Sequence, residues 1–219
     1  MKARYLIPFI ILLTTVLSLP YAKKSNNIHD ALAARRKPKV LLIPRGRSSS
    51  DFMITEELGV MRTMLEDAGI KVHVATDNGE PYEGDEITIK VDTTLSEADI
   101  NDYVGLIMPC MALGLPGPVY PEAIQLVKEA VAKGIPVAAQ YGSVVTLSEA
   151  DVLEGIQFAG PDMVSRWVGD EKYMGYGVVQ DGNIITSGTC PHMAKESGRP
   201  DGTPELTSLF IEAIKEQSQ

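Results

Sequence analysis

Positive charge is scarce in this chain of 219 residues, in which 20 lysine and arginine residues face 29 aspartate and glutamate residues. The formal net charge is −9, and because residues 1–39 carry +7, the rest of the chain carries −16. A protein body this acidic repels the phosphate backbone of DNA or RNA. The shortage of positive charge therefore argues against nucleic acid as a partner.

Long hydrophobic runs are also scarce, and the one near the N-terminus, residues 5–19, is short for a membrane span. Two basic residues precede it, which is the layout of a secretory signal peptide. We therefore predict a signal peptide over residues 1–22, a basic linker over residues 23–38 and an exported protein, periplasmic or extracellular. Because two lysines follow at positions 23 and 24, an uncleaved N-terminal anchor is the alternative, and it would be the only contact with a membrane.

Cysteine is limited to Cys110 and Cys190, and the chain has three histidines. A metal site can be drawn from these two cysteines, His192 and Glu57, but no spacing rule for metal ligands supports it. The sequence therefore predicts no metal site, and we expect no cofactor.

Hydrophobic runs alternate with helical patterns from residue 39 to the C-terminus, which is typical of an α/β protein with a parallel sheet. The segments expected as strands are residues 40–44, 70–76, 87–91, 103–108 and 135–139, with a hairpin around residues 181–183. The segments expected as helices are residues 52–68, 94–100, 121–133, 204–215 and one beginning at residue 144. We predict one domain over residues 39–219, with ligands bound at the carboxyl ends of the strands.

The predicted helix over residues 52–68 carries one acidic residue on its apolar face. Placing successive residues about 100° apart puts Glu57 inside the hydrophobic arc, between Met64 and Ala68. A helix glutamate is usually solvated. A carboxyl group turned inward near the strand ends would instead have its pKa raised by burial unless donors surround it. Glu57 is therefore a candidate catalytic residue.

Residues 135–147, IPVAAQYGSVVTL, predict a buried strand that turns sharply into a helix. In α/β hydrolases such a turn presents a nucleophile beside backbone N–H groups that can hold an oxyanion. Here the residue at the apex is Tyr141, so the reactive atom is missing. The Gly- and Pro-rich loop over residues 109–118 has backbone N–H groups free to serve a ligand. The candidate ligand-binding residues in these two segments are Cys110, Met111, Gly142 and Ser143.

In their order, these segments resemble the DJ-1/PfpI family of the class I glutamine amidotransferase-like superfamily. The segments that carry the resemblance are VLLIPRG, the helix of Glu57, YVGLIMP, LVKEAVAKGIPVAA and VVQDGNIITS. Together they cover nearly all of residues 39–216. The resemblance implies a flavodoxin-like three-layer sandwich with a mainly parallel central sheet, and a homodimer, as in many relatives.

Members of the family typically carry a cysteine at the elbow, in a sequence like AICHGP, supported by a helix glutamate and often by a histidine. On this resemblance Glu57 matches the glutamate and Tyr141 stands at the cysteine position. Gly142 stands where the histidine often follows, and Cys110 stands at a glycine of the oxyanion loop. The departure calls into question the family's protease, amidase, glyoxalase and deglycase activities in this chain.

Tyrosine is a poor replacement for the cysteine nucleophile. Its pKa is near 10, so roughly one phenol in a thousand is ionised at neutral pH. We therefore expect the ring of Tyr141 to fill or gate a pocket, with its hydroxyl available for binding. A ring that simply plugs an abandoned site is the alternative.

The two cysteines are expected on loops at the same edge of the sheet, in a protein that reaches an oxidising compartment. A disulfide between Cys110 and Cys190 would close roughly 80 residues and contribute about 4.5 kcal/mol. It requires that their Cα atoms come within about 7 Å. If both thiols are free, Cys190 and His192 are a candidate thiolate pair.

These observations leave two main hypotheses. The first is an exported, non-hydrolytic protein that binds a small polar molecule or a partner in a cleft between Glu57 and Tyr141. The second is a hydrolase or lyase of the same family, amidase- or protease-like or glyoxalase- or deglycase-like, that uses Cys190 or a water oriented by Glu57. A third, an electron carrier, would need a phosphate-binding loop, for which residues 45–51 are the only candidate.

Overall fold

A seven-stranded sheet forms the centre of the computed structural model, which describes residues 37–217. The predicted signal peptide and nearly all of the basic linker lie outside the described residues. The strands are β1 (Lys39–Leu42), β2 (Lys71–Thr76), β5 (Thr93–Thr94), β6 (Gly105–Met108), β7 (Val137–Gln140), β8 (Val178–Asp181) and β9 (Ile184–Ser187). Their order is β5-β2-β1-β6-β7-β9-β8, and every pair is parallel except the hairpin β8-β9.

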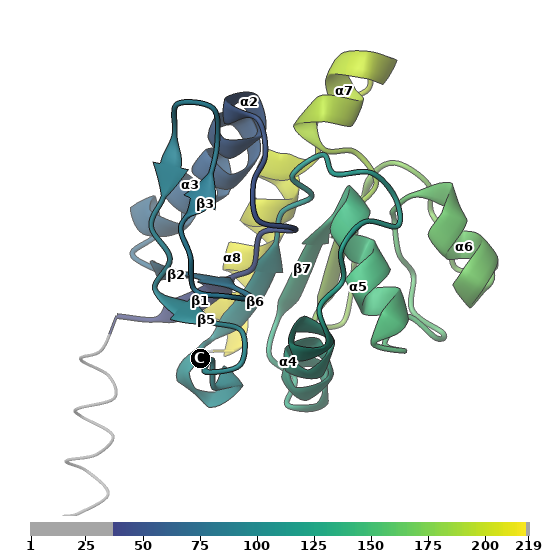
Figure 1. The fold of residues 1–219 in the computed structure, drawn as a ribbon. Coiled ribbons are helices and arrows are strands. Elements are labelled where there is room, and N and C mark those ends of the chain that lie inside the picture. The colour runs from purple at the N-terminus through teal and green to yellow at the C-terminus, as the bar shows by residue number, and fades with distance from the viewer. Residues whose placement is uncertain (1–36, 218–219) are drawn as a thin grey trace, which may run out of the picture. The chain divides into compact units, whose positions relative to one another are not determined.

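Helices cover both faces of this sheet (Figure 1). One face packs against a continuous helical segment, made of α2 (Asp51–Met53), the π-helical turn η1 (Ile54–Gly59) and α3 (Val60–Asp67), and against α8 (Thr203–Gln217). The other packs against η2 (Ile100–Asp102), α4 (Pro121–Ala132), α5 (Val144–Glu149) and α6 (Asp162–Val168). The expected flavodoxin-like three-layer α/β sandwich with a mainly parallel sheet is thus confirmed.

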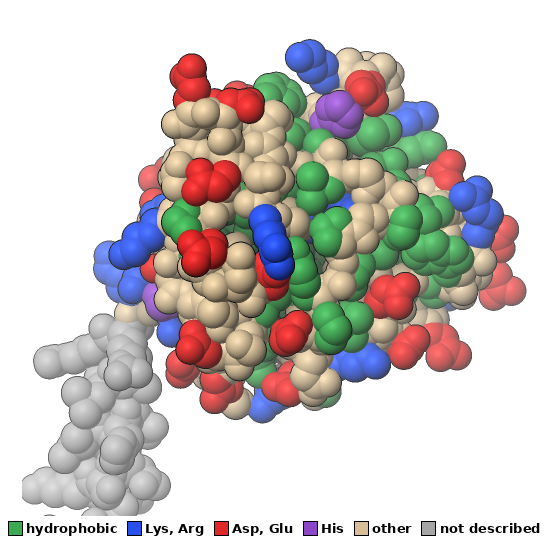
Figure 2. All heavy atoms as spheres, viewed as in Figure 1, with side chains coloured by type: hydrophobic (Ala, Val, Ile, Leu, Met, Phe, Trp, Pro, Cys, Tyr) green, Lys and Arg blue, Asp and Glu red, His purple; other side chains and the backbone are tan. Residues whose placement is uncertain are grey.

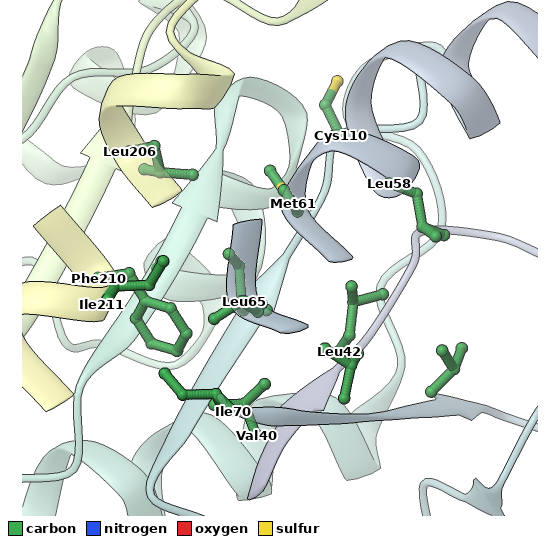
Figure 3. Close-up of a cluster of buried hydrophobic side chains, with 14 of the residues drawn as sticks. Val40, Leu42, Leu58, Met61, Leu65, Ile70, Cys110, Leu206, Phe210 and Ile211 are labelled. Carbon is green, nitrogen blue, oxygen red and sulfur yellow. The ribbon is translucent and has the colours of Figure 1, made fainter. Parts of the chain in front are cut away.

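Strand β1 shows how the sequence builds two cores at once. Successive side chains of a strand point to opposite faces. Val40 and Leu42 pack in the cluster under α3 and α8, whereas Leu41 packs in the cluster under α4 and α5. Figure 3 shows the first of these clusters, with Cys110 at its edge and the sulfur directed away from the labelled aliphatic side chains. Central parallel strands therefore read as continuous hydrophobic runs.

Two local predictions were wrong, and a third was correct. Residues 94–100 do not form a helix, because β5 ends at Thr94 and only the 3-10 turn η2 follows, capped by the Asp99 side chain. The short strand or extended arm expected at residues 87–91 is present as β4 (Thr88–Ile89), which pairs with β3 (Tyr82–Glu83) outside the main sheet. The loop on which Cys190 was expected contains the helix α7 (Pro191–Ser197), and Cys190 is its N-cap residue. A single turn or two of helix is too short to show a 3.6-residue period, so pattern alone cannot separate it from a loop.

No helix within residues 37–217 has the length and apolar character required to cross a membrane.

Candidate functional site

The elbow predicted at the end of β7 is present. The strand ends at Gln140, and the chain turns through the 3-10 helix η3 (Tyr141–Ser143) into α5. Tyr141 has a φ of 35°, which is uncommon for a residue with a side chain. Such a conformation persists only where the surrounding structure fixes it, and it is most frequent at functional sites. Tyr141 thus stands at the carboxyl edge of the sheet, on a strained turn.

Glu57 points into the protein, as its place in the hydrophobic arc predicted, and its side chain is 0% exposed. It comes from the π-helical turn η1, a feature frequent at functional sites. The backbone N–H of Cys110 donates to its Oε1 at 2.9 Å, and the N–H of Met111 donates to Oε2 at 2.7 Å. Burial, followed by the neighbouring Cys110, raises the pKa of Glu57 well above its usual value. Glu57 therefore holds the start of the loop that follows β6.

Arg45, which the sequence analysis did not single out, holds the rest of this loop. Its side chain is buried, and it donates to the carbonyl oxygens of Cys110 and Leu113 at 3.3 Å, Gly114 at 3.1 Å and Pro116 at 2.9 Å. Arg45 is the only lysine or arginine among the buried residues of the described chain. Its one sequence signal is its place shortly after β1, which ends at Leu42, at the edge where ligands bind in this fold.

The thiol of Cys110 lies in a cradle of donors. Arg45 Nη1 is 3.9 Å from the sulfur, and the backbone N–H groups of Gly142 and Ala112 point to it. A hydrogen bond from the Cys190 thiol lowers the pKa of Cys110 to about 6, and the charge of Arg45 acts in the same direction against the effect of burial. That bond and burial raise the pKa of Cys190. The donors in this part of the site therefore converge on the sulfur of Cys110.

Both cysteines are free in the structure. The proposed disulfide between Cys110 and Cys190 stays a prediction. The other suggested arrangement, a pair of Cys190 and His192, is not formed. His192 is partly exposed on α7, and its Nε2 lies 3.1 Å from Glu196 Oε1, one helical turn away. Cys190 is 0% exposed and lies in the same buried hydrophobic cluster as Cys110.

The cleft expected between Glu57 and Tyr141 differs from what the described residues show. Glu57 is sealed beneath the loop that follows β6, because both of its oxygens accept from that loop. The four candidate ligand-binding residues, Cys110, Met111, Gly142 and Ser143, are buried as well. The Ser143 hydroxyl, for example, donates to the carbonyl oxygen of Pro109 at 2.7 Å. These residues build the floor of the site, and none of them lines the open pocket.

A pocket of about 280 Å³ lies on the outer side of Tyr141. Its lining includes Tyr141, Asp162, Arg166, Tyr176, Met193 and Arg199. Figure 2 shows hydrophobic side chains gathered on the side of the molecule where α6 and α7 lie. This pocket leaves no signal in the sequence, because most of its walls come from two short helices and an irregular segment that carry no long-period pattern.

The pocket has an excess of positive charge. The guanidinium of Arg199 stacks on the Tyr176 ring, 3.5 Å from its centroid. The carboxylate of Asp162 is already engaged, since it accepts from the Tyr173 hydroxyl at 2.6 Å and the Tyr176 hydroxyl at 3.4 Å. Within residues 37–217, neither Arg166 nor Arg199 forms an ion pair. Two cationic groups are thus available to a ligand.

The Tyr141 hydroxyl is also available, since it has no hydrogen-bond partner in the part of the chain that the structure describes. Burial, followed by the charge of Cys110, raises the pKa of Tyr141. The phenol therefore keeps its proton at neutral pH and can serve as a donor. No group of three or more His, Cys, Asp or Glu side chains within residues 37–217 could hold a metal ion.

The side chain of Arg45 leaves no room for a Cβ atom at Gly142, so this position requires glycine. A Cβ atom at Gly142 would overlap with Nη1 of Arg45 and lie 3.1 Å from the Cys110 sulfur. We expect Gly142→Ala to lower the free energy of unfolding by about 1–3 kcal/mol through overpacking, measured by urea denaturation. Gly177→Ala is the matched control, because a Cβ there meets nothing within 4 Å. Equal stability of the two variants would contradict the position of Arg45.

Comparison with known proteins identifies relatives of this fold. A sequence model of the DJ-1/PfpI family matches residues 34–196. No curated protein matches the chain. Among solved structures, the ThiJ/PfpI domain protein from Brachyspira murdochii superposes with a TM-score of 0.66 at 20% identity, covering 83% of this chain and 99% of that one.

Two further solved structures are similar. Drosophila melanogaster DJ-1beta superposes with a TM-score of 0.60 at 23% identity, covering 83% of this chain and 95% of its own. Toxoplasma gondii DJ-1, in an oxidized form, gives 0.59 at 20% identity, covering 81% and 94%. At these identities the likeness shows the fold.

Proposed function

From the premise that this chain belongs to the DJ-1/PfpI family, we propose that it is an exported, non-hydrolytic member that binds a small carboxylate in the pocket beside Tyr141. Tyr141 takes the place of the family's nucleophilic cysteine, and its ring forms one wall of the binding site. Export rests on the signal-peptide pattern of residues 1–22. A homodimer is part of the proposal on the resemblance to the family.

The observation that carries the proposal is the pair Arg166 and Arg199, which form no ion pair among residues 37–217 and line the same pocket as the phenol of Tyr141. The chain has a net charge of −9, so a pocket with two guanidinium groups and one engaged carboxylate differs in sign from the whole protein. Arginine binds carboxylates through paired, charge-assisted hydrogen bonds. An organic anion is therefore the ligand class that the pocket complements.

The size and the lining of the pocket indicate which organic anions could fit. Its volume of about 280 Å³ lies just below the range of roughly 300–1,000 Å³ that is usual for drug-sized ligands. Met163 and Met193 supply apolar walls, and Arg199 is held in place by its stacking on Tyr176. These features favour a compact molecule with one or two carboxylates on a short carbon skeleton.

The alternative, a hydrolase or lyase that uses Cys190 or a water oriented by Glu57, has less support. Cys190 is fully buried with its pKa raised, so it is neither accessible nor ionised. Both oxygens of Glu57 already accept backbone N–H groups, which leaves it poorly placed to orient a water. We expect the protein to leave glyoxals and small amides unchanged.

Calorimetric titration of the purified full chain with succinate and pyruvate tests the proposal. We expect saturable binding, weakened at least about tenfold by Arg166→Gln or by Arg199→Gln, because each removes charge-assisted hydrogen bonds worth about 1.5–3 kcal/mol. Arg62→Gln is the matched control, since Arg62 is an exposed arginine on α3 paired with Glu66.

Two results would reject binding at this pocket. One is the absence of saturable binding to the wild-type protein. The other is an equal loss of affinity in Arg62→Gln and Arg199→Gln, which would indicate a general charge effect. Turnover of methylglyoxal that disappears in Glu57→Gln would instead establish the enzymatic alternative.

A further inference from the structure

Exposed large hydrophobic side chains gather around the binding pocket. Among residues 37–217 the large hydrophobic side chains that are exposed belong to Phe52, Leu115, Trp167, Met174 and Tyr176. Leu115 and Tyr176 line the pocket itself. Soluble proteins rarely leave large apolar side chains together at the surface unless a partner or a ligand covers them. A small carboxylate inside the pocket would leave those outside it uncovered.

Trp167 extends one wall of the pocket. Met163, in the first turn of α6, lines the pocket. Trp167 follows four residues later, and side chains four residues apart lie next to each other on the same face of a helix. On the other side of α6, Ser165 is buried and Val168 packs against the cluster under α4 and α5. The indole of Trp167, 49% exposed, therefore stands at the edge of the pocket.

Leu115 belongs to a second wall, formed by the loop after β6. Arg45 donates to the carbonyl oxygens of both its neighbours, Gly114 at 3.1 Å and Pro116 at 2.9 Å. The side chain of Leu115 is 37% exposed although its backbone is held on both sides. An apolar group fixed in this way loses little conformational freedom on binding, which favours contact with a partner.

The segment between α6 and β8 supplies a third wall, with Met174 and Tyr176. Met174 is 56% exposed, and its backbone N–H donates to the carbonyl oxygen of Phe158 at 2.8 Å. Exposed methionine is frequent at binding surfaces because its side chain adapts to different partners. We call Leu115, Trp167, Met174 and Tyr176 the apolar rim. Figure 2 shows hydrophobic side chains at the surface on the side of α6 and α7.

We propose that this surface binds the free C-terminus of a polypeptide, with the terminal carboxylate on Arg166 and Arg199 and the last apolar side chains against the apolar rim. This binding mode rests on the carboxylate site proposed above and specifies which molecule carries the carboxylate. The last residue of a chain is itself a carboxylate on a short carbon skeleton, so it fits the pocket. The residues before it then lie on the rim.

Charge complementarity favours a chain end as the partner. Arg166 and Arg199 form no ion pair among residues 37–217, so they are available to an anion. In a C-terminal residue the α-carboxylate and the side chain sit on the same carbon atom, so an anion and an apolar group arrive together. The pocket of about 280 Å³ and the apolar rim beside it present the matching pair of surfaces.

A fatty acid also combines a carboxylate with apolar surface, but the apolar rim fits it less well. Sites for small molecules usually bury roughly 70–90% of the ligand surface. The rim side chains come from three separate segments of an open surface, so an alkyl chain lying on them would remain partly in water. A polypeptide can instead turn its polar groups to the solvent side.

Calorimetric titration of the full chain tests this binding mode. The ligands are succinate and an N-acetylated pentapeptide that ends in Leu-Val with a free carboxylate. We expect the pentapeptide to bind at least about tenfold more tightly than succinate, because it also covers the apolar rim. The same peptide with a C-terminal amide should bind at least about tenfold more weakly than the free acid, because it cannot pair with the arginines.

Trp167→Ser separates the apolar rim from the carboxylate site. It should weaken binding of the pentapeptide at least about tenfold, as expected for a tryptophan at the centre of an interface, and leave the affinity for succinate nearly unchanged. Phe52→Ser is the matched control, because Phe52 is an aromatic residue 39% exposed that contacts Lys195 and does not line the pocket. Met174→Ser repeats the test on another segment should Trp167→Ser fail to fold.

The outcomes distinguish this binding mode from the carboxylate site itself. Saturable binding of succinate with no gain for the pentapeptide, or equal binding of the amidated peptide, would overturn the peptide inference alone. Equal effects of Trp167→Ser and Phe52→Ser would do the same, as would decanoate binding as tightly as the pentapeptide. Absence of binding for both succinate and the pentapeptide would reject the carboxylate site and the peptide inference together.

Discussion

Replacing Glu57 with alanine is expected to lower the free energy of unfolding by about 4 kcal/mol or more. The substitution removes the acceptors of two buried N–H groups, those of Cys110 and Met111. Each unsatisfied buried donor costs about 1–3 kcal/mol, and the lost side chain leaves a cavity in addition. Urea denaturation of the full chain measures the change.

The matched control for this substitution is Glu56→Ala. Glu56 is the preceding residue of the same π-helical turn, but its side chain is exposed. We expect its replacement to change stability by less than about 0.5 kcal/mol. A Glu57→Ala variant as stable as Glu56→Ala would mean that Glu57 does not hold the loop after β6.

Replacing Arg45 with methionine is the second large effect that we expect. Methionine fills similar apolar space but leaves four loop carbonyl oxygens, from Cys110 to Pro116, without their donor. At about 1 kcal/mol for each hydrogen bond, the loss should reach about 3–4 kcal/mol. The positive charge next to Cys110 also disappears, so the pKa of Cys110 should rise. The ultraviolet absorbance of the thiolate, followed against pH, reports that rise.

Arg47→Met is the control for this second prediction. Arg47 lies two residues further along the chain, with its side chain 67% exposed and ion-paired to Asp77 at 2.7 Å. Exposed ion pairs contribute about 0–1 kcal/mol, so the variant should stay close to the wild type. If Arg45→Met kept both its stability and the thiolate titration of the wild type, Arg45 would have no role in building the site.

The fold and the inward Glu57 could be predicted from the sequence because both leave local patterns. Continuous hydrophobic runs marked the buried parallel strands, and the helical period placed Glu57 on the apolar arc. The sharp turn at Tyr141 was visible as a hydrophobic run broken by Gly142 and Ser143. Each of these signals spans a few consecutive residues, which is the range over which sequence patterns are informative.

The chemistry around Cys110 could not be predicted in the same way. Arg45 and Cys110 are 65 positions apart, and no periodicity reports a hydrogen bond across that separation. The sequence indicated Cys190 as the reactive thiol because His192 follows it closely. In the structure the donors converge on Cys110 instead, with Arg45 Nη1 3.9 Å from its sulfur. Tertiary contacts, rather than sequence neighbours, determine which thiol is ionised.

The ring of Tyr141 separates the pocket from the protein interior. It lines the pocket together with Arg166 and Arg199, and it also packs against the hydrophobic cluster that contains Cys110 and Cys190. An aromatic residue on a strained turn thus forms the inner wall of the proposed anion site.

The most direct test of carboxylate binding uses Trp167, the only tryptophan of the chain, which lies on α6 next to Arg166 and is 49% exposed. Its fluorescence should change saturably when the full chain is titrated with succinate, and the change should need much more ligand in Arg199→Gln. The neutral diamide succinamide should leave the fluorescence unchanged. No response to succinate, or an equal response to succinamide, would contradict an anion site beside Tyr141.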